Sequence, residues 1–307
     1  MTLDKKEKIF SRINVHGKGL EIGPSHNPMA PKSQGYDIEI IDHLSKEDLQ
    51  EKYRSHGLNI DNIEEVDYIW SGENFEQLTG KSKYYDYIVA SHVIEHTPDL
   101  IAFLKSCESV LKEDGVLSLV IPDKRYCFDY YRPVTGLARI VDSHYQKNQR
   151  HTVGSCVEYF LNVVSLSGQI AWDEYSDGVY SFVHSLDDAQ QAIKRVENQE
   201  YIDVHAWCFT PSTFRLLMHD LYILGFTELK EVCFYETFGC EFYISLGRSG
   251  NGINTPRLDL LSEINRENVN TKNTSKPVFL KSLKAQTISL FSKIVYRLKR
   301  LKYLLKK

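Results

Sequence analysis

Short apolar runs alternate with helical patterns in the first 125 residues, and this alternation limits the possible folds more than any other feature of the chain. The runs are bounded by turn-forming residues and lie at Leu20–Ile22, Ile38–Ile41, Val66–Trp70, Tyr85–Ala90 and Val116–Ile121. Between them, apolar residues recur at helical spacing in Lys46–Tyr53 and Leu100–Leu111. Strands and helices in alternation predict a parallel sheet assembled from βαβ units. We therefore expect an α/β fold with a doubly wound, mostly parallel sheet and helices on both faces.

Punctuating residues indicate where these elements begin and end. Thr97-Pro98-Asp99 is typical of a helix start, and Glu113-Asp114-Gly115 of a helix stop before the next strand. Further along, Thr210-Pro211-Ser212 predicts a helix that runs to Leu224. Two apolar strands are expected after it, Phe226–Tyr235 and Cys240–Leu246. A closing hairpin of this kind gives a parallel sheet an antiparallel edge.

Three segments differ from this regular pattern. Residues 124–208 are rich in Tyr, His and Asp, with helices expected at Pro133–Gln146 and Leu186–Asn198, and we interpret them as an inserted cap on the main domain of residues 1–248. Residues 249–277 have the Asn, Thr and Ser content of a flexible linker. Residues 278–307 have leucines at helical spacing among basic residues, which predicts a basic amphipathic helix.

Charge is distributed unevenly along the chain. The net charge of −4 argues against a nucleic-acid partner, but residues 276–307 contain ten Lys or Arg and no Asp or Glu. A basic amphipathic segment on an acidic body suits an anionic membrane surface, a partner protein, or packing on its own domain or a second copy. The N-terminus lacks the apolar core of a signal peptide, and no stretch is long enough to span a membrane. We expect a cytoplasmic protein, with peripheral contact at the inner membrane face as one option.

The segment Gly19-Leu20-Glu21-Ile22-Gly23-Pro24-Ser25-His26-Asn27-Pro28 ends an apolar strand and begins a turn. In an open α/β sheet, ligands bind beyond the carboxyl ends of the strands, where a glycine allows close approach of the backbone. Asp42 follows 19 residues after Gly23 at the end of the next strand, and an acidic residue at that spacing binds ribose hydroxyls in such sheets. The spacing therefore predicts a nucleoside-containing ligand.

Three ordered motifs resemble those of the class I S-adenosylmethionine-dependent methyltransferases. Leu20–Gly23 resembles motif I, Tyr85–His96 the fourth-strand motif, and Leu111–Leu117 the helix stop before the fifth strand. The resemblance covers residues 17–123 and 210–246 and implies a seven-stranded Rossmann-like sheet. The stretch Ile121–Asp129 with Arg132-Pro133 further resembles a branch associated with bacterial surface-polysaccharide biosynthesis.

The resemblance implies S-adenosylmethionine as cofactor and assigns its contacts. Glu21 would hold the methionine ammonium, Gly23 would allow close approach, Asp42 would bind the ribose, Trp70 would border the adenine, and Ser91 would lie under the sulfonium. The family pattern places glycines at positions 25 and 27, where this chain has Ser25 and Asn27. A differently shaped turn is therefore expected, with Ser25 retained as a cofactor contact.

Methyl transfer to a hydroxyl requires alignment of the acceptor and removal of its proton. His96 and His92 are the favoured catalytic residues because they leave the fourth strand where an acceptor would lie, while Glu95, Asp123, His144 and His205 are further candidates. An anionic acceptor would be bound by a substrate set of Asp123, Lys124, Arg125 and Arg132, although the arginines would equally serve as structural ion-pair partners. A metal is possible but not indicated, and no ligands are predicted, because no C-x-x-C pair occurs and the Asp and His residues are scattered.

The sequence favours S-adenosylmethionine-dependent O-methylation of a sugar in a bacterial surface glycan or its precursor. One alternative is methylation of another small molecule. A second is a non-catalytic Rossmann-type module that recruits polysaccharide enzymes through residues 278–307, which the two missing glycines keep open. A sugar-nucleotide dehydrogenase is disfavoured because no G-x-G-x-x-G follows a strand.

Overall fold

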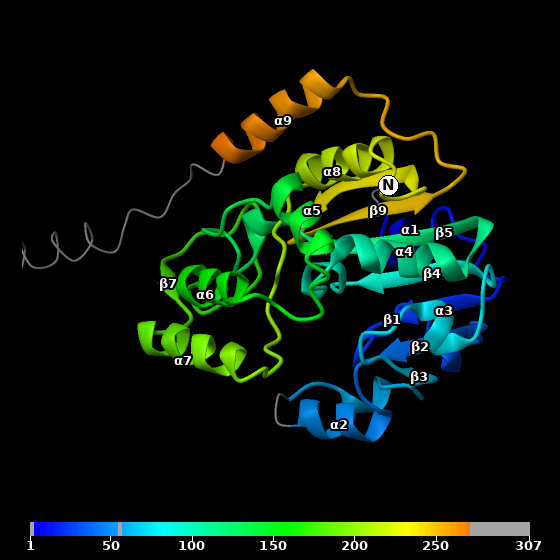
Figure 1. Ribbon diagram of the computed structural model, residues 1–307, viewed down its shortest axis with the longest axis horizontal. Coiled ribbons are helices and arrows are strands. Elements are labelled where there is room, and N and C mark those ends of the chain that lie inside the picture. The colour runs from blue at the N-terminus through cyan, green and yellow to red at the C-terminus, as the bar shows by residue number, and fades with distance from the viewer. Residues whose placement is uncertain (1–2, 55–56, 271–307) are drawn as a thin grey trace, which may run out of the picture.

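The computed structural model describes residues 3–54 and 57–270, and a seven-stranded sheet lies at its centre (Figure 1). The strand order is β3-β2-β1-β4-β5-β9-β8. Strand β9 runs antiparallel to both of its neighbours, β5 and β8, and the other pairs are parallel. The bounds are β1 Gly19–Ile22, β2 Ile38–Asp42, β3 Tyr68–Ile69, β4 Tyr85–Ser91, β5 Leu111–Pro122, β8 Lys230–Phe238 and β9 Glu241–Gly247. This topology confirms the predicted doubly wound, mostly parallel sheet with an antiparallel closing hairpin.

Helices cover the sheet and form the cap (Figure 1). Those of the main domain are α1 Lys5–Phe10, α2 Lys46–Arg54, α3 Phe75–Thr79, α4 Leu100–Val110 and α8 Pro211–Ile223. The segment interpreted as a cap contains α5 Leu137–Tyr145, α6 Val153–Asn162, α7 Leu186–Glu197 and a two-stranded sheet of β6 Val164–Leu166 and β7 Tyr180–Phe182. Helix α6 and this small sheet were not predicted from the sequence. Short 3-10 turns occupy Lys32–Gln34, Ile60–Asn62, Ile94–His96 and Lys124–Tyr126.

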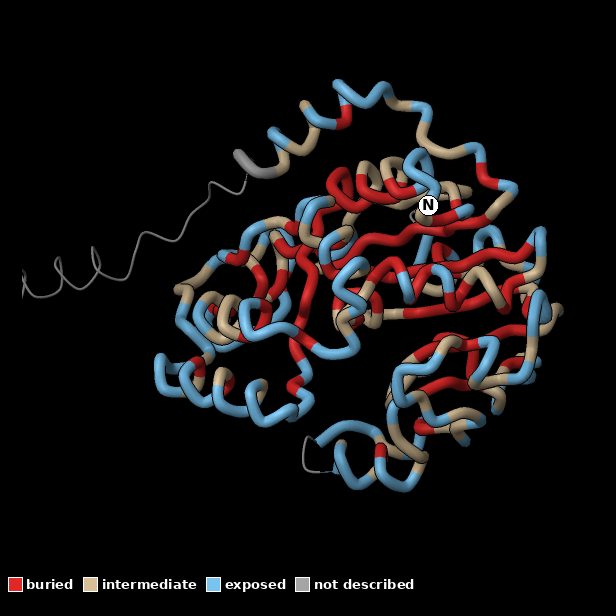
Figure 2. Tube along the Cα trace, viewed as in Figure 1, coloured by how far each residue is buried: buried red, intermediate tan, exposed pale blue. Residues whose placement is uncertain are grey.

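The two faces of the central sheet are packed differently. Alternate residues of β1, such as Leu20 and Ile22, face a large core shared with α4 and α8. The opposite face has a smaller core, in which Ile9 of α1 packs with Tyr87 and Val89 of β4. In Figure 2 the buried stretches concentrate in the central strands and the helix faces turned toward them. The carboxyl-end edge of the sheet is thus held by packing on both sides.

The boundary between α4 and β5 differs from the prediction. Asp99 caps α4 by accepting a hydrogen bond from the Ala102 N–H at 2.9 Å, as the sequence suggested, but the helix ends at Val110. Leu111 is already paired with β4, so the predicted stop at Glu113-Asp114-Gly115 lies inside β5. Gly115 is required there by close packing, because a Cβ would come within 3.1 Å of the Tyr85 carbonyl oxygen.

The segment predicted as a flexible linker contains a helix, α9, at Arg257–Asn270. Its Glu267 carboxylate accepts a hydrogen bond from the Ser212 hydroxyl at 2.8 Å, at the start of α8, and its Leu260 is buried. These tertiary contacts outweigh the Asn-rich composition that favoured a linker. The predicted basic helix at 278–307 lies outside the described residues. Among the described helices, none is long and apolar enough to cross a membrane.

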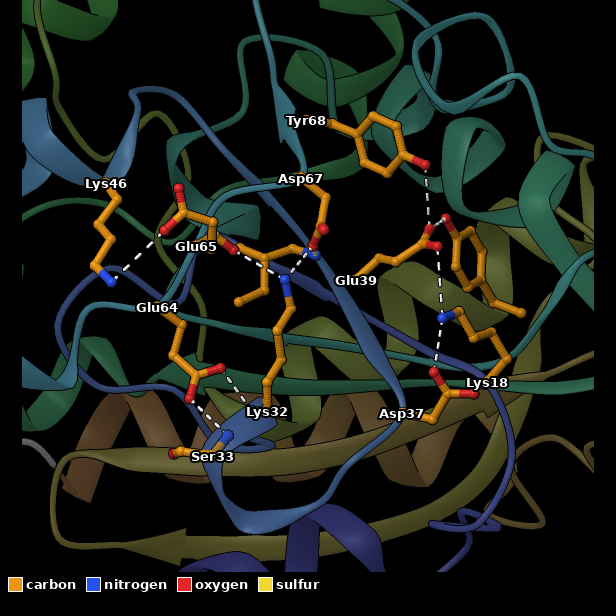
Figure 3. Close-up of polar contacts among 12 residues, drawn as sticks. Lys18, Lys32, Ser33, Asp37, Glu39, Lys46, Glu64, Glu65, Asp67 and Tyr68 are labelled. Atoms are coloured by element: carbon orange, nitrogen blue, oxygen red, sulfur yellow. Dashed lines mark hydrogen bonds and ion pairs between the residues drawn. The ribbon is translucent and has the colours of Figure 1, made fainter.

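Polar contacts tie the β2 edge of the sheet to the loops around it (Figure 3). Glu64 accepts hydrogen bonds from the backbone N–H groups of Lys32 at 2.6 Å and Ser33 at 3.0 Å. Asp67 accepts hydrogen bonds from Lys32 Nζ at 2.6 Å and from the Ile40 N–H of β2 at 2.7 Å. These contacts fix β2 from its outer side, and the strand ends at Asp42.

Candidate functional site

The turn after β1 keeps a glycine-like backbone where the sequence lacks a glycine. Gly23 has φ +63°, and Ser25, two residues on, also adopts the left-handed region with φ +49°. The Ser25 N–H donates to Asp42 Oδ2 at 3.1 Å, which stabilises this conformation for a residue with a Cβ. Ser25 thus takes a left-handed conformation that a glycine would adopt without strain, and the predicted difference in the shape of the turn stays a prediction.

A side chain at Gly23 would be both crowded and strained. A Cβ built there would lie 3.0 Å from Val93 Cγ2, and the positive φ adds strain for any L residue. Gly23 and Ser25 both line a large cavity at the carboxyl ends of the strands. The turn therefore offers the close backbone approach that a nucleoside cofactor requires in such a sheet.

Glu21, the predicted partner of the methionine ammonium, is bonded to a backbone loop and does not line the cavity. Its side chain is buried, and its two oxygens accept hydrogen bonds from the Met29 N–H at 2.6 Å and the Ala30 N–H at 3.1 Å. It is not among the residues that line the cavity. Burial raises the pKa of Glu21 to about 7, although the two N–H groups oppose this shift. Its role in the structure is to hold the far end of the loop that begins at Gly23.

Asp42 lies at the carboxyl end of β2 and lines the cavity, as predicted. Besides the Ser25 N–H, it accepts a hydrogen bond from the His43 N–H at 2.7 Å. Trp70, just beyond β3, also lines the cavity, and its ring packs edge-on against Phe75 with centroids 5.3 Å apart. A carboxylate and an indole on adjacent strand ends form a suitable cradle for a ribose and an adenine ring.

The cavity has a volume of about 1750 Å³ and extends from the strand ends to the cap. Of the predicted site residues, Gly23, Ser25, Asp42, Trp70, Ser91, His92 and His96 line it. The cap and its flanks supply further lining residues: His144, Tyr145, Asn148, Gln149, Arg150, Tyr201 and Asp203. The cavity thus has one wall made of strand ends and another made of polar and aromatic residues from residues 124–208.

His92 is held by a carboxylate that lies 149 positions away in the sequence. It adopts the left-handed region with φ +56°, and its Nε2 lies 2.7 Å from Glu241 Oε2 at the start of β9. Burial opposes ionisation of Glu241, but the hydrogen bond to His92 and the charge of Lys5 lower its pKa to about 2. With Nε2–H donated to this carboxylate, His92 Nδ1 carries the lone pair. A histidine oriented in this way is suited to general-base catalysis.

His96 has a similar arrangement, with Nδ1 2.8 Å from Asp203 Oδ1. Burial lowers its pKa, but the hydrogen bond to Asp203 and the nearby charge of Glu95 outweigh this and leave the pKa raised. Its ring meets the ring of His205 edge-on, with centroids 4.6 Å apart. Glu95 and His205 are buried beside it and do not line the cavity.

The predicted substrate set, Asp123, Lys124, Arg125 and Arg132, does not line this cavity, and its role in substrate binding stays a prediction. Arg125 donates from Nε to Asp123 Oδ1 at 2.9 Å, within a bidentate ion pair. Lys124 Nζ donates to the Tyr130 carbonyl oxygen at 2.8 Å. Arg132 is fully buried and pairs with Asp129 at 2.7 Å. The two arginines are thus paired with buried carboxylates, which was the structural alternative for them.

Several site residues were missed from the sequence. Glu241 and Asp203 orient the two histidines, yet neither stands in a motif. Tyr145 and Tyr201 are exposed aromatic residues in the cavity wall, and only their place in the Tyr-rich segment 124–208 marked them. No group of metal-ligand residues was apparent in the sequence either. In the structure, Glu95, His96 and His205 offer ligand atoms that lie within 4.8 Å of one another.

Similarities to known proteins indicate the family of the chain. Residues 2–221 match a family model described as a methyltransferase domain. A search of curated proteins found no match. Among solved structures, a SAM-dependent methyltransferase from Aquifex aeolicus is 18% identical with a TM-score of 0.30, over 39% of this chain and 65% of that one.

Two further solved structures share low sequence identity with the chain. A SAM-dependent methyltransferase from Methanosarcina mazei is 16% identical with a TM-score of 0.40, over 80% of this chain and 98% of that one. The trans-methyltransferase CalH, solved in complex with SAH, is 14% identical with a TM-score of 0.37, over 76% of this chain and 51% of that one. The family model covers well over half of the chain. The chain therefore belongs to the family of proteins with this methyltransferase domain.

Proposed function

We propose that this methyltransferase O-methylates a sugar hydroxyl of a bacterial surface glycan or its precursor. The observation that carries the proposal is the His92–Glu241 pair, held at 2.7 Å in the wall of a cavity that continues past the cofactor residues into the cap. Transfer to a hydroxyl needs a base at the acceptor, and an oriented imidazole supplies one.

The size of the cavity supports a second substrate beside the cofactor. Its volume of about 1750 Å³ exceeds the roughly 300–1,000 Å³ of a pocket for one small ligand. Gly23, Ser25, Asp42 and Trp70 occupy the strand-end wall and His92 lies farther along the sheet edge. The remaining space borders the cap, where an acceptor would be enclosed.

The cap wall has the chemistry of a sugar-binding surface. Tyr145 and Tyr201 offer exposed aromatic faces, and Asn148 and Gln149 offer amide donors and acceptors. Arg150 also lines this wall and suits a sugar acid or a phosphate. This position replaces the substrate set expected at residues 123–132.

The reaction requires little covalent chemistry from the protein. S-adenosylmethionine supplies an electrophilic methyl group, so one C–S bond breaks as one O–C bond forms at the acceptor oxygen. Asp42 and the Gly23 turn hold the donor side, and the cap wall orients the acceptor hydroxyl. His92 Nδ1 takes the hydroxyl proton, and Glu241 stabilises the resulting imidazolium through Nε2–H.

The test is acceptor profiling with S-adenosylmethionine, using neutral sugars, sugar acids, nucleotide sugars and lipid-linked sugars, followed by determination of the methylated atom. The proposal expects an O-methyl sugar from the wild type and from His16→Ala, a control at an exposed histidine remote from the cavity. Exclusive methylation of nitrogen, carbon or a non-sugar hydroxyl would overturn the acceptor class. Cofactor binding without transfer to any acceptor would favour the recruiting-module alternative.

For residues 278–307, which lie outside the described residues, we propose docking to an anionic membrane surface on the basis of their basic amphipathic sequence. The full chain should float with vesicles containing anionic lipids, and a chain ending at residue 275 should not. Equal flotation of the two chains would contradict this. Loss of a partner protein rather than of vesicles on truncation would place the contact on a glycan enzyme instead.

A further inference from the structure

Three side chains beside the cavity form a cluster in which each offers a hydrogen-bond acceptor and none donates a hydrogen bond to another. Glu95, His96 and His205 each offer one ligand atom, and these atoms lie within 4.8 Å of one another. Glu95 and His96 come from the 3-10 turn after β4, and His205 comes from the segment that leads into α8. The backbone joins the two segments, because the Ala206 N–H donates to the Glu95 carbonyl oxygen at 2.7 Å.

Glu95 is the unexplained member of the cluster. Its side chain has no solvent exposure, and within the described residues neither carboxylate oxygen has a hydrogen-bond partner. The nitrogen atoms His92 Nδ1 and His205 Nε2 lie 3.6 and 3.9 Å from Glu95 Oε1, beyond hydrogen-bond distance. A buried carboxylate without donors is costly, so a cation or a proton has to balance it.

The two histidines are oriented as metal ligands are. His96 Nδ1 is 2.8 Å from Asp203, and His205 Nδ1 is 2.6 Å from Asp129. A ring nitrogen donated to a carboxylate fixes the tautomer and leaves the lone pair on Nε2. Carboxylate–histidine pairs of this kind are the usual outer support of a metal site.

We propose that Glu95, His96 and His205 bind one divalent transition-metal ion of the zinc class, with Asp203 and Asp129 as supporting carboxylates. Two imidazoles and one carboxylate form a donor set that such ions prefer and that leaves a coordination position open. Bond lengths of about 2.1 Å would require ligand atoms about 3.4 Å apart in a tetrahedral site, so small side-chain rotations complete it. Because only His96 of the three lines the cavity, the ion lies in the cavity wall.

The charge around the cluster favours a cation. Asp129 is already paired with Arg132, and Asp203 faces His96. Among the described residues, Glu95 has no hydrogen-bond donor and no lysine or arginine partner, and the nearest nitrogen atoms are those of His92 and His205. Close by, His151 is buried with neither ring nitrogen hydrogen-bonded, and burial lowers its pKa to about 4, so it brings no charge. If a proton on Glu95 or His96 balances this charge instead of a metal ion, the protein should have no metal affinity. The test distinguishes these two cases.

The test is zinc titration of tag-free, chelator-treated full-length protein in competition with a chromophoric chelator, with cobalt absorption as a second readout. The wild type should bind one equivalent, with cobalt bands that indicate four or five ligands. His205→Ala and Glu95→Gln should each weaken binding by more than about a hundredfold, and Asp203→Asn by about 10- to 100-fold through His96. His144→Ala is the matched control, because His144 also lines the cavity and pairs with Asp99 at 2.9 Å but faces no free carboxylate.

Circular dichroism of each metal-free variant separates loss of the site from loss of the fold. If the buried variants unfold, the Asp203→Asn result carries the test, because the Asp203 side chain is exposed and the variant is expected to fold. A wild type that binds no zinc, or variants that bind it as tightly as the wild type, would overturn the proposal. Both outcomes are independent of which acceptor the enzyme methylates.

Discussion

The two walls of the cavity are built in opposite ways. On the wall proposed to bind the cofactor, Gly23 and Ser25 follow β1, and Ser25 contacts Asp42 at the end of β2, only 17 positions away. On the wall proposed to bind the acceptor, His92 pairs with Glu241, 149 positions away, and His96 pairs with Asp203, 107 positions away. A wall made from successive strand ends depends on local motifs. The acceptor wall depends on where the cap and the closing hairpin fold back, so its chemistry is set by tertiary structure.

The largest expected effect is on catalysis at the acceptor wall. His92→Ala should lower kcat by about 10²- to 10⁴-fold, the usual contribution of a positioned base, with little change in S-adenosylmethionine affinity. Single-turnover transfer with a bound acceptor measures this. A variant that keeps full turnover would show that the base is elsewhere or that the acceptor needs none. Weaker S-adenosylmethionine binding in His92→Ala, with an unchanged single-turnover rate at saturating cofactor, would move His92 to the other wall.

The second largest expected effect is on the stability of the protein when Glu241, the distant partner of His92, is replaced. The pKa of Glu241 falls to about 2 in the fold, so its stabilisation is present above the unfolded-state pKa and is lost as pH falls through about 2. Relative to wild type, Glu241→Gln should unfold more easily at pH 7 by roughly 3 kcal/mol, and the difference should shrink between about pH 4.5 and pH 2. Urea unfolding across this range measures it, with the exposed, remote Glu200→Gln as control. A pH-independent difference would contradict the account.

The third effect is on the cofactor wall. Asp42→Ala should weaken S-adenosylmethionine binding by about 10- to 100-fold, because a charge-assisted acceptor for the ribose is lost together with the anchor of the Ser25 turn. Asp37→Asn, at an exposed carboxylate just before β2, should leave binding unchanged. Calorimetry compares the two. Unchanged binding in Asp42→Ala would mean that the ribose lies elsewhere.

The smallest expected effect is on the turn that contains Ser25, in the same wall of the cavity. Ser25 holds a left-handed conformation, so Ser25→Gly should keep the cofactor affinity within about threefold, while Ser25→Val should destabilise the turn by about 1–2 kcal/mol. Thermal unfolding and calorimetry of the pair measure both. A valine variant that binds and unfolds like the glycine variant would show that the turn has another conformation when the cofactor is bound.

The same contrast explains what could be predicted from the sequence. The mostly parallel sheet followed from the alternation of apolar runs, and Gly23, Asp42, Trp70 and Ser91 lie at the ends of strands that meet at one edge. Glu21 was predicted as a cofactor contact because its motif position says nothing of the loop backbone at Met29 and Ala30 that occupies it.

The limits of prediction on the acceptor side have a different origin. Arg125 and Arg132 were assigned to substrate because a basic cluster cannot show, in sequence, that buried Asp123 and Asp129 neutralise it. Glu241, Asp203 and His205 come from segments that only the fold brings to the turn after β4. The helix at 257–270 was missed for the same reason, since Glu267 has its partner at the start of α8.

The most direct test of the central claim is calorimetric titration of the wild-type protein with S-adenosylmethionine, S-adenosylhomocysteine and NAD. A methyltransferase built on the Gly23–Asp42 wall should bind the two sulfur nucleosides with one site each and with dissociation constants on the order of micromolar. It should not bind NAD, because no G-x-G-x-x-G turn follows β1. Binding of NAD in preference to both sulfur ligands, or no binding of either sulfur ligand, would contradict the account.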